Sequence, residues 1–153
     1  MSDEPLLLEK MLELLSEEGF NYERHDEDHA ARIVHQGKDV EWGCVAQVWE
    51  EQRVFAFYSV SPLRPTAAHL AATSEFVHRA NVGILAGNFE VDLDDGEVRF
   101  KTMVGFGPEG EWSDELARVV IYTNLAAMSH YIVALLSVIT GAADAASSLA
   151  SIE

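Results

Sequence analysis

The chain has 153 residues, with 26 Asp or Glu against 10 Lys or Arg, and its formal net charge is −16 at pH 7. A field of this sign repels phosphate backbones and anionic membrane surfaces, so neither nucleic acid nor a membrane is expected as a partner. The hydrophobic fraction of 48% is typical of a packed domain rather than of a disordered chain. We therefore expect one soluble domain over residues 1–140, with its charge on a folded surface.

Cys44 is the single cysteine, so the chain can form no internal disulfide. A reducing cytoplasm is therefore the expected location. The N-terminus is acidic rather than basic and runs into an apolar helical pattern, so no signal peptide is expected.

Residues 5–18 are predicted to form the first helix, because apolar side chains recur there at helical spacing. Ser2 or Asp3 is expected to cap this helix, and Gly19 is expected to end it. The apolar stripe consists of Leu8, Met11, Leu12 and Leu15.

The pattern changes to the alternation of β-strands between about residue 20 and residue 60. Two short strands are predicted at 20–24 and 32–35, and two longer strands at 42–50 and 53–60. The longer pair is apolar on both faces, which is typical of strands in the centre of a sheet or covered on both sides.

A second helix and a hairpin are predicted next. The helix runs from Thr66 to about Ala80, and Asn81 is expected to stop it in the left-handed conformation. The hairpin is expected to turn tightly at Asp95-Gly96, because a two-residue primed turn accepts Asp and Gly at least cost. This turn sets the predicted pairs, which are Leu93 with Val98, Val91 with Phe100, Phe89 with Thr102, Asp92 with Arg99 and Glu90 with Lys101.

The third helix is predicted from Ser113 to Thr140, and no charged residue lies between Arg118 and Asp144. Its length and composition leave a membrane-associated protein as one alternative, although polar residues interrupt the run. A helix apolar nearly all round is buried on more than one side, so a second copy of the chain is the expected cover. The tail 141–153 is rich in Ala and Ser and is predicted to be flexible. The candidates for the dimer interface are Ile121, Leu125, Met128, Ile132 and Leu136.

No reactive constellation stands out, so the sequence predicts no catalytic residue, no metal site and no cofactor. His25 and His29 flank Asp26–Asp28, but they lie in a predicted polar turn and no third ligand follows at a suitable spacing. Cys44 lies among apolar strand residues, which raise the pKa of a thiol and argue against a nucleophile. A small-ligand-binding domain, or an enzyme with an unrecognised site, stays open as the other alternative.

The order of these elements predicts an α+β fold, in which an antiparallel sheet packs with three helices in the order α-β-β-β-β-α-β-β-α. The central strands carry more aromatic side chains than one small core needs, and aromatic residues are typical anchors of protein interfaces. The candidates for binding a partner are Trp42, Trp49, Phe55, Phe57 and Tyr58.

The region around the hairpin also carries a family resemblance. A helix ending at Asn81 is followed by the run Gly87-x-Phe89-x-Val-Asp-Leu-Asp-x-Gly96-x-Val98, and together they resemble the YbjN-domain family of bacterial sensory transduction regulators. The resemblance covers residues 5–140 and implies a twisted sheet similar to that of type III secretion chaperones, a dimer, and no catalytic residues. The sequence thus predicts a non-catalytic, dimeric domain that binds an unknown protein segment as a chaperone-like or regulatory adaptor.

Overall fold

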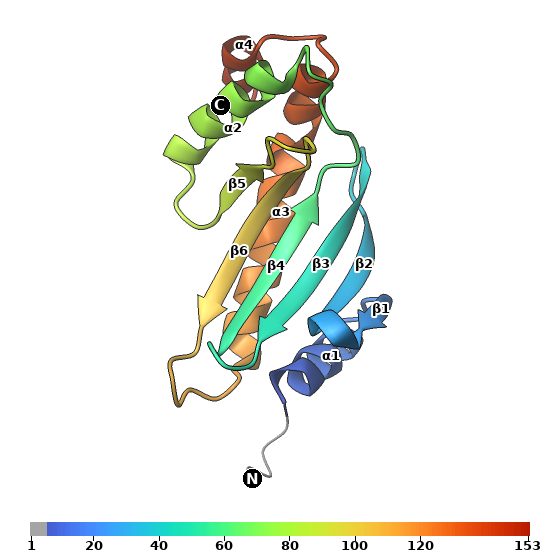
Figure 1. Cartoon of the computed structure of the whole chain (residues 1–153), viewed down its shortest axis with the longest axis vertical. Coiled ribbons are helices and arrows are strands. Elements are labelled where there is room, and N and C mark those ends of the chain that lie inside the picture. The colour runs from blue at the N-terminus through green and yellow to red at the C-terminus, as the bar shows by residue number, and fades with distance from the viewer. Residues whose placement is uncertain (1–5) are drawn as a thin grey trace.

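Helices cover one face of a six-stranded antiparallel sheet in this protein, whose computed structural model describes residues 6–153 (Figure 1). This architecture confirms the predicted α+β class. The strands lie in the order β1-β2-β3-β4-β6-β5, so β3 and β4 occupy the centre as their apolar sequences predict. The strands are β1 Tyr22–His25, β2 Ala30–Gln36, β3 Glu41–Trp49, β4 Val54–Val60, β5 Asn88–Val91 and β6 Val98–Gly105.

Helix α3 (Asp114–Ile139) runs along the sheet behind β4 and β6, and α1 (Leu7–Glu17) lies beside it against β3 (Figure 1). Helices α2 (Leu70–Gly83) and α4 (Ala145–Ala150) pack against the C-terminal part of α3 at one end of the sheet. A short 3-10 turn, Asp26–Asp28, links β1 to β2. Within residues 6–153, no α-helix lies on the face of the sheet opposite α1 and α3.

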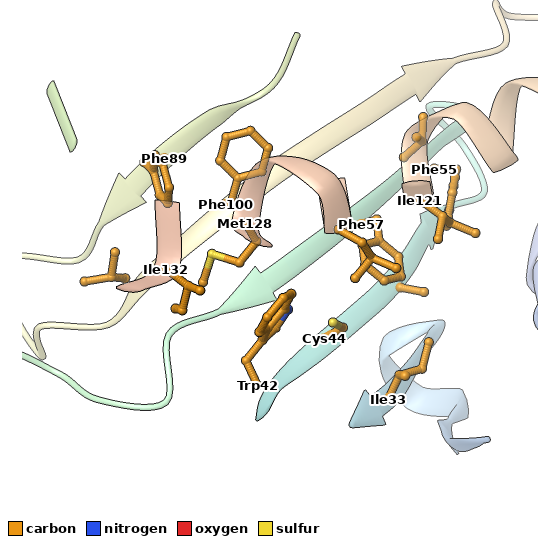
Figure 2. Close-up of a cluster of buried hydrophobic side chains, with 14 of the residues drawn as sticks. Ile33, Trp42, Cys44, Phe55, Phe57, Phe89, Phe100, Ile121, Met128 and Ile132 are labelled. Atoms are coloured by element: carbon orange, nitrogen blue, oxygen red, sulfur yellow. The ribbon is translucent and has the colours of Figure 1, made fainter. Parts of the chain in front are cut away.

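The core lies between the sheet and these helices (Figure 2). Alternate residues of β3 and β4 point into it, because side chains on a strand alternate between the two faces. The strands contribute Trp42, Cys44, Ala46, Val48, Phe55 and Phe57, while α3 contributes Ile121, Met128 and Ile132.

The first helix begins later than predicted. It starts at Leu7, and the proposed caps Ser2 and Asp3 lie outside the described residues. The carboxylate of Glu50, at the end of β3, accepts the backbone N–H groups of Leu7 and Leu8 at 2.8 and 2.9 Å. A side chain remote in sequence therefore caps α1.

The predicted end of α1 is confirmed. Gly19 has a φ of +83°, which a side chain would strain. The N–H of Phe20 donates to the carbonyl of Leu15 at 2.9 Å, and that of Gly19 donates to Ser16 at 3.1 Å. These two bonds form the pair expected of a Schellman motif.

The hairpin register is shifted by two residues from the prediction. Phe89 pairs with Phe100 and Val91 with Val98, so the connecting loop spans 92–97. The carboxylates of Asp92 and Asp95 accept the N–H groups of residues 94 and 97 at 2.8 Å each, which closes a longer loop than a two-residue turn. A shift of two residues leaves each side chain on its predicted face.

Asn81 does not stop α2 in the left-handed conformation, because the helix continues to Gly83 and Asn81 has no positive φ. Its side chain instead accepts the N–H of Phe89 at 2.7 Å and donates to the carbonyl of the same residue at 3.1 Å. The Asn81 amide thus bonds the backbone of β5 in the way that the backbone of a neighbouring strand would. Gly87 lies so close to β6 that a Cβ would lie 2.8 Å from the carbonyl oxygen of Lys101.

The prediction of a flexible tail from residue 141 is wrong for residues 145–150, which form α4. The side chain of Asp144 accepts the N–H of Ser147 at 2.9 Å and caps this helix. Leu149 is buried, and Ser148 donates to the carbonyl of Ala134 on α3 at 2.8 Å. Composition alone suggested disorder, whereas a cap and two inward-facing residues give this segment a place in the core.

Candidate interaction surface on the open sheet face

The sheet presents one face that no described element covers (Figure 1). We call it the open sheet face, and it consists of the side chains on β2, β3, β4 and β6 that alternate with the core residues. Val34 is 70% exposed and Met103 is 51% exposed on this face, so apolar surface is left in contact with water. The members are Arg32, Val34, Val45, Gln47, Trp49, Val54, Ala56, Tyr58, Val60, Arg99, Lys101 and Met103.

Trp49 lies in the wall of a shallow apolar cavity of about 390 Å³ on this face. Its remaining walls come from the β3–β4 turn and from β4 and β6. The side chains concerned are Gln52, Val54, Ala56, Tyr58, Lys101 and Met103. The cavity can accept one apolar side chain of a partner, with the indole and the thioether as its main contact surfaces.

A second cavity, of about 240 Å³, adjoins the first and shares Trp49 and Gln52 with it. Acidic residues from the 3-10 turn and the β3–β4 turn surround this second space, namely Glu27, Asp28, Glu50 and Glu51. Glu50 is engaged with the start of α1 and with His29 Nδ1 at 3.3 Å. No described residue forms an ion pair or a side-chain hydrogen bond with the carboxylates of the other three.

Two of the three basic residues of the open sheet face, Arg99 and Lys101, are paired with an acid. Arg99 Nε lies 3.0 Å from Glu90, and Lys101 Nζ lies 3.4 Å from the same carboxylate. The guanidinium of Arg99 also stacks on the ring of Tyr58, 4.4 Å from its centroid. These contacts keep Tyr58 only 8% exposed, although it lies on the uncovered face.

A larger depression of about 790 Å³ lies at the other end of this face, around Tyr22, Arg32, Val45 and Arg64. Arg64 pairs with Glu97 at 3.1 Å. Cys44, the one thiol among the lining residues, is buried on the core side of β3. Burial raises the pKa of this thiol to about 11, as its apolar neighbours predict.

The structure divides the aromatic partner candidates between the two faces. Trp42, Phe55 and Phe57 point into the core and are buried. They cannot contact a partner, so their proposed role in partner binding is wrong. Trp49 and Tyr58 lie on the open sheet face. The sequence could not separate the two groups, because β3 and β4 are apolar on both faces. Their residues therefore do not show which face the helices cover.

The candidates for the dimer interface also require correction. Four of them, Ile121, Leu125, Met128 and Ile132, are buried in the core of the single chain, and Leu136 is half-buried. The outer side of α3 carries a different uncharged stripe, in which Val119 is 58% exposed and Val133 is 52% exposed. The stripe follows a three-four spacing that the sequence contained, namely Leu116, Val119, Thr123, Ala126, His130, Val133, Ser137 and Thr140.

Helix α3 has the length and composition of a membrane span, although its inner side lies against the sheet. Among the described residues, no three His, Cys, Asp or Glu side chains are placed to hold a metal ion.

The chain is an α+β protein whose fold is similar to that of the type III secretion chaperones. Residues 7–137 match the model of the YbjN family, described as "Putative bacterial sensory transduction regulator", and the chain belongs to this family. The crystal structure of YbjN from E. coli superposes with a TM-score of 0.62 at 11% identity, covering 85% of this chain and 89% of that one. A chain of the ExsC–ExsE complex has a TM-score of 0.51 at 13% identity, covering 83% and 94%. No curated protein matches.

Proposed function

We propose that this protein is a non-catalytic adaptor of the cytoplasm, chaperone-like or regulatory, that binds a segment of another protein and acts as a homodimer. The observation that carries the proposal is the open sheet face, where Met103 stays exposed beside Trp49 at one end and Val34 stays exposed towards the other end. Exposed apolar surface of this kind marks interaction sites. The family description and the fold shared with a chain of the ExsC–ExsE complex support a role in protein binding.

The outer stripe of α3 is the proposed dimer contact. The helix has 26 residues and is about 39 Å long, so the stripe is long enough for a helix pair. A contact between two chains of charge −16 must avoid acidic surface, and this stripe contains none. Asp114 and Glu115 lie at one end of the helix, so an antiparallel pair keeps these charges apart.

Light scattering during size-exclusion chromatography tests the dimer. A mass of twice 16.9 kDa is expected for the natural chain, and the single mass for the double variant Val119→Glu, Val133→Glu. Val82→Glu is the matched control, because Val82 is 83% exposed on α2, away from the stripe. A monomeric natural chain at micromolar concentration would remove the dimer from the proposal.

Affinity capture from the native lysate at the salt concentration of the cell tests the adaptor role. Specific proteins are expected on the natural chain, and they are expected to be lost from the variant Val34→Glu, Met103→Glu, which charges the open sheet face. Retention of the same proteins by that variant would place binding elsewhere. Capture of no protein at all would favour a small ligand and point to the cavity of about 790 Å³.

A further inference from the structure

Two cavities with opposite chemistry meet at Trp49. One is the apolar space bounded by Val54, Ala56 and Met103, whose wall also includes Lys101, a residue paired with Glu90. The other is the space bounded by acidic residues. Both cavities include Trp49 and Gln52, so a single ligand can occupy both. The pair is therefore a composite site with one apolar and one anionic part.

Most of the negative charge of the anionic part is not neutralised by any described cation. Glu27, Asp28 and Glu51 come from two different turns, and no described cation pairs with any of them. By contrast, Glu90 is paired with Arg99 and Lys101 on the other side of the open sheet face. Carboxylates gathered in this way repel one another, and a cation placed among them lowers that repulsion.

The indole of Trp49 strengthens the preference for a cation. An aromatic face attracts a positive charge, and Trp does so most strongly among the aromatic residues. The net charge of −16 attracts basic segments from a distance and repels acidic ones. An acidic or neutral ligand gains neither of these interactions.

We propose that the composite site at Trp49 binds an extended protein segment with an apolar side chain in the cavity beside Met103 and a Lys or Arg among Glu27, Asp28 and Glu51. The inference rests on the proposed function and names the chemistry of its partner. Side chains two residues apart point to the same side of an extended chain, about 7 Å from each other. The closest such spacing, an apolar residue and a basic residue at i and i+2 in either direction, is the pattern that this proposal expects.

Selection from a random peptide library on the immobilised full chain, at about 150 mM salt, tests this proposal. The expected winners contain the apolar-x-basic pattern. Each winner is then measured by fluorescence anisotropy against Trp49→Ala, for which we expect a loss of roughly tenfold or more, and Glu51→Gln, for which we expect roughly threefold. Glu115→Gln on α3 is the charge-matched control and should change nothing, while Trp49→Phe should restore most of the affinity.

The outcomes separate this proposal from the proposed function. Winners without basic residues, or with affinities that Trp49→Ala leaves unchanged, would overturn the composite site and leave the adaptor role in place. A library that yields no winner would count against both. Weaker binding with rising salt is expected for the natural chain, and the slope should flatten in Glu51→Gln but not in Glu115→Gln.

Discussion

The Oδ1 atom of Asn124 accepts a hydrogen bond from Ser59 Oγ at 2.6 Å in the middle of the core. Asn124 is fully buried on α3, and its Nδ2 donates to the carbonyls of Phe57 at 2.7 Å and Phe100 at 3.0 Å. Ser59 in turn accepts from Trp42 Nε1 at 2.9 Å. One amide thus ties the long apolar helix to β4 and β6 and fixes where it lies along the sheet.

Replacing Asn124 with Ala should lower the free energy of unfolding by about 2–4 kcal/mol, because Ser59 loses its partner and a cavity replaces the amide. Urea denaturation followed by tryptophan fluorescence measures this change. Ser129→Ala, at an exposed position of the same helix, should cost less than about 0.5 kcal/mol. Equal stabilities for the two variants would contradict a structural role of the network.

The sequence predicted the helix that contains Asn124 but not the partners of its side chain. Its polar residues argued against a membrane span, and their positions gave no sign that this one faces a serine 65 positions earlier in the chain. Hydrophobic periodicity indicated the existence of α1, α2, α3 and the strand pairs, since each depends on local spacing. Contacts between remote side chains depend on how the elements pack, which one sequence does not state.

Glu50→Ala should destabilise the protein by about 1–2 kcal/mol, because two N–H groups at the start of α1 lose their acceptor. Hydrogen exchange should show the first turn of α1 opening more readily while the centre of the sheet stays protected. Glu51→Ala removes the neighbouring acid, which has no partner among the described residues, and should leave stability within about 0.5 kcal/mol. Similar losses in both variants would point to general charge effects instead of capping.

The candidate site could also be predicted only in part from the sequence. Sequence indicated Trp49 and Tyr58 as surface anchors together with three residues that proved to be core, because alternation identifies two sets of residues without naming the buried one. The acidic cavity beside Trp49 could not be predicted from the sequence for a different reason. Its carboxylates come from turns that are more than twenty positions apart and that only the register of β2 with β3 brings together.

Cys44 should resist alkylation in the folded protein. Its pKa of about 11 leaves almost no thiolate at about pH 8, and its side chain is 2% exposed. Iodoacetamide should therefore modify the natural chain only in denaturant, at the rate of an ordinary thiol. Rapid modification without denaturant, detected by mass spectrometry, would contradict the burial of Cys44 in the core beside Ser59.

Asn81→Ala should lower the free energy of unfolding by about 1–2 kcal/mol, because the backbone of Phe89 loses both bonds to the amide. The effect should be local at the edge strand β5, so that hydrogen exchange at Phe89 accelerates more than exchange in β4. Asn21→Ala, at an exposed position before β1, is the matched control and should be nearly neutral. Asn81→Asp keeps the acceptor but loses the donor, and an intermediate cost is expected.

The contact between α1 and α3 at Glu18 should make stability depend on acid. The hydroxyl of Tyr122 at 2.8 Å, and then Arg118 at 3.2 Å, lower the pKa of the Glu18 carboxyl below its usual range. A carboxyl with a lowered folded-state pKa stabilises the protein above its unfolded-state pKa, and this contribution is lost as pH falls through the folded-state value. Glu18→Gln should therefore melt at a lower temperature than the natural chain near pH 7.

At a pH below the lowered pKa of Glu18 the two proteins should melt alike, because both then carry a neutral side chain at position 18. Glu17→Gln changes the adjacent acid, which is exposed, and should follow the natural chain at every pH. Tyr122→Phe removes the hydroxyl and should reproduce part of the Glu18→Gln effect at neutral pH. A constant difference between Glu18→Gln and the natural chain across the whole pH range would show that the loss comes from packing and not from the charge of Glu18.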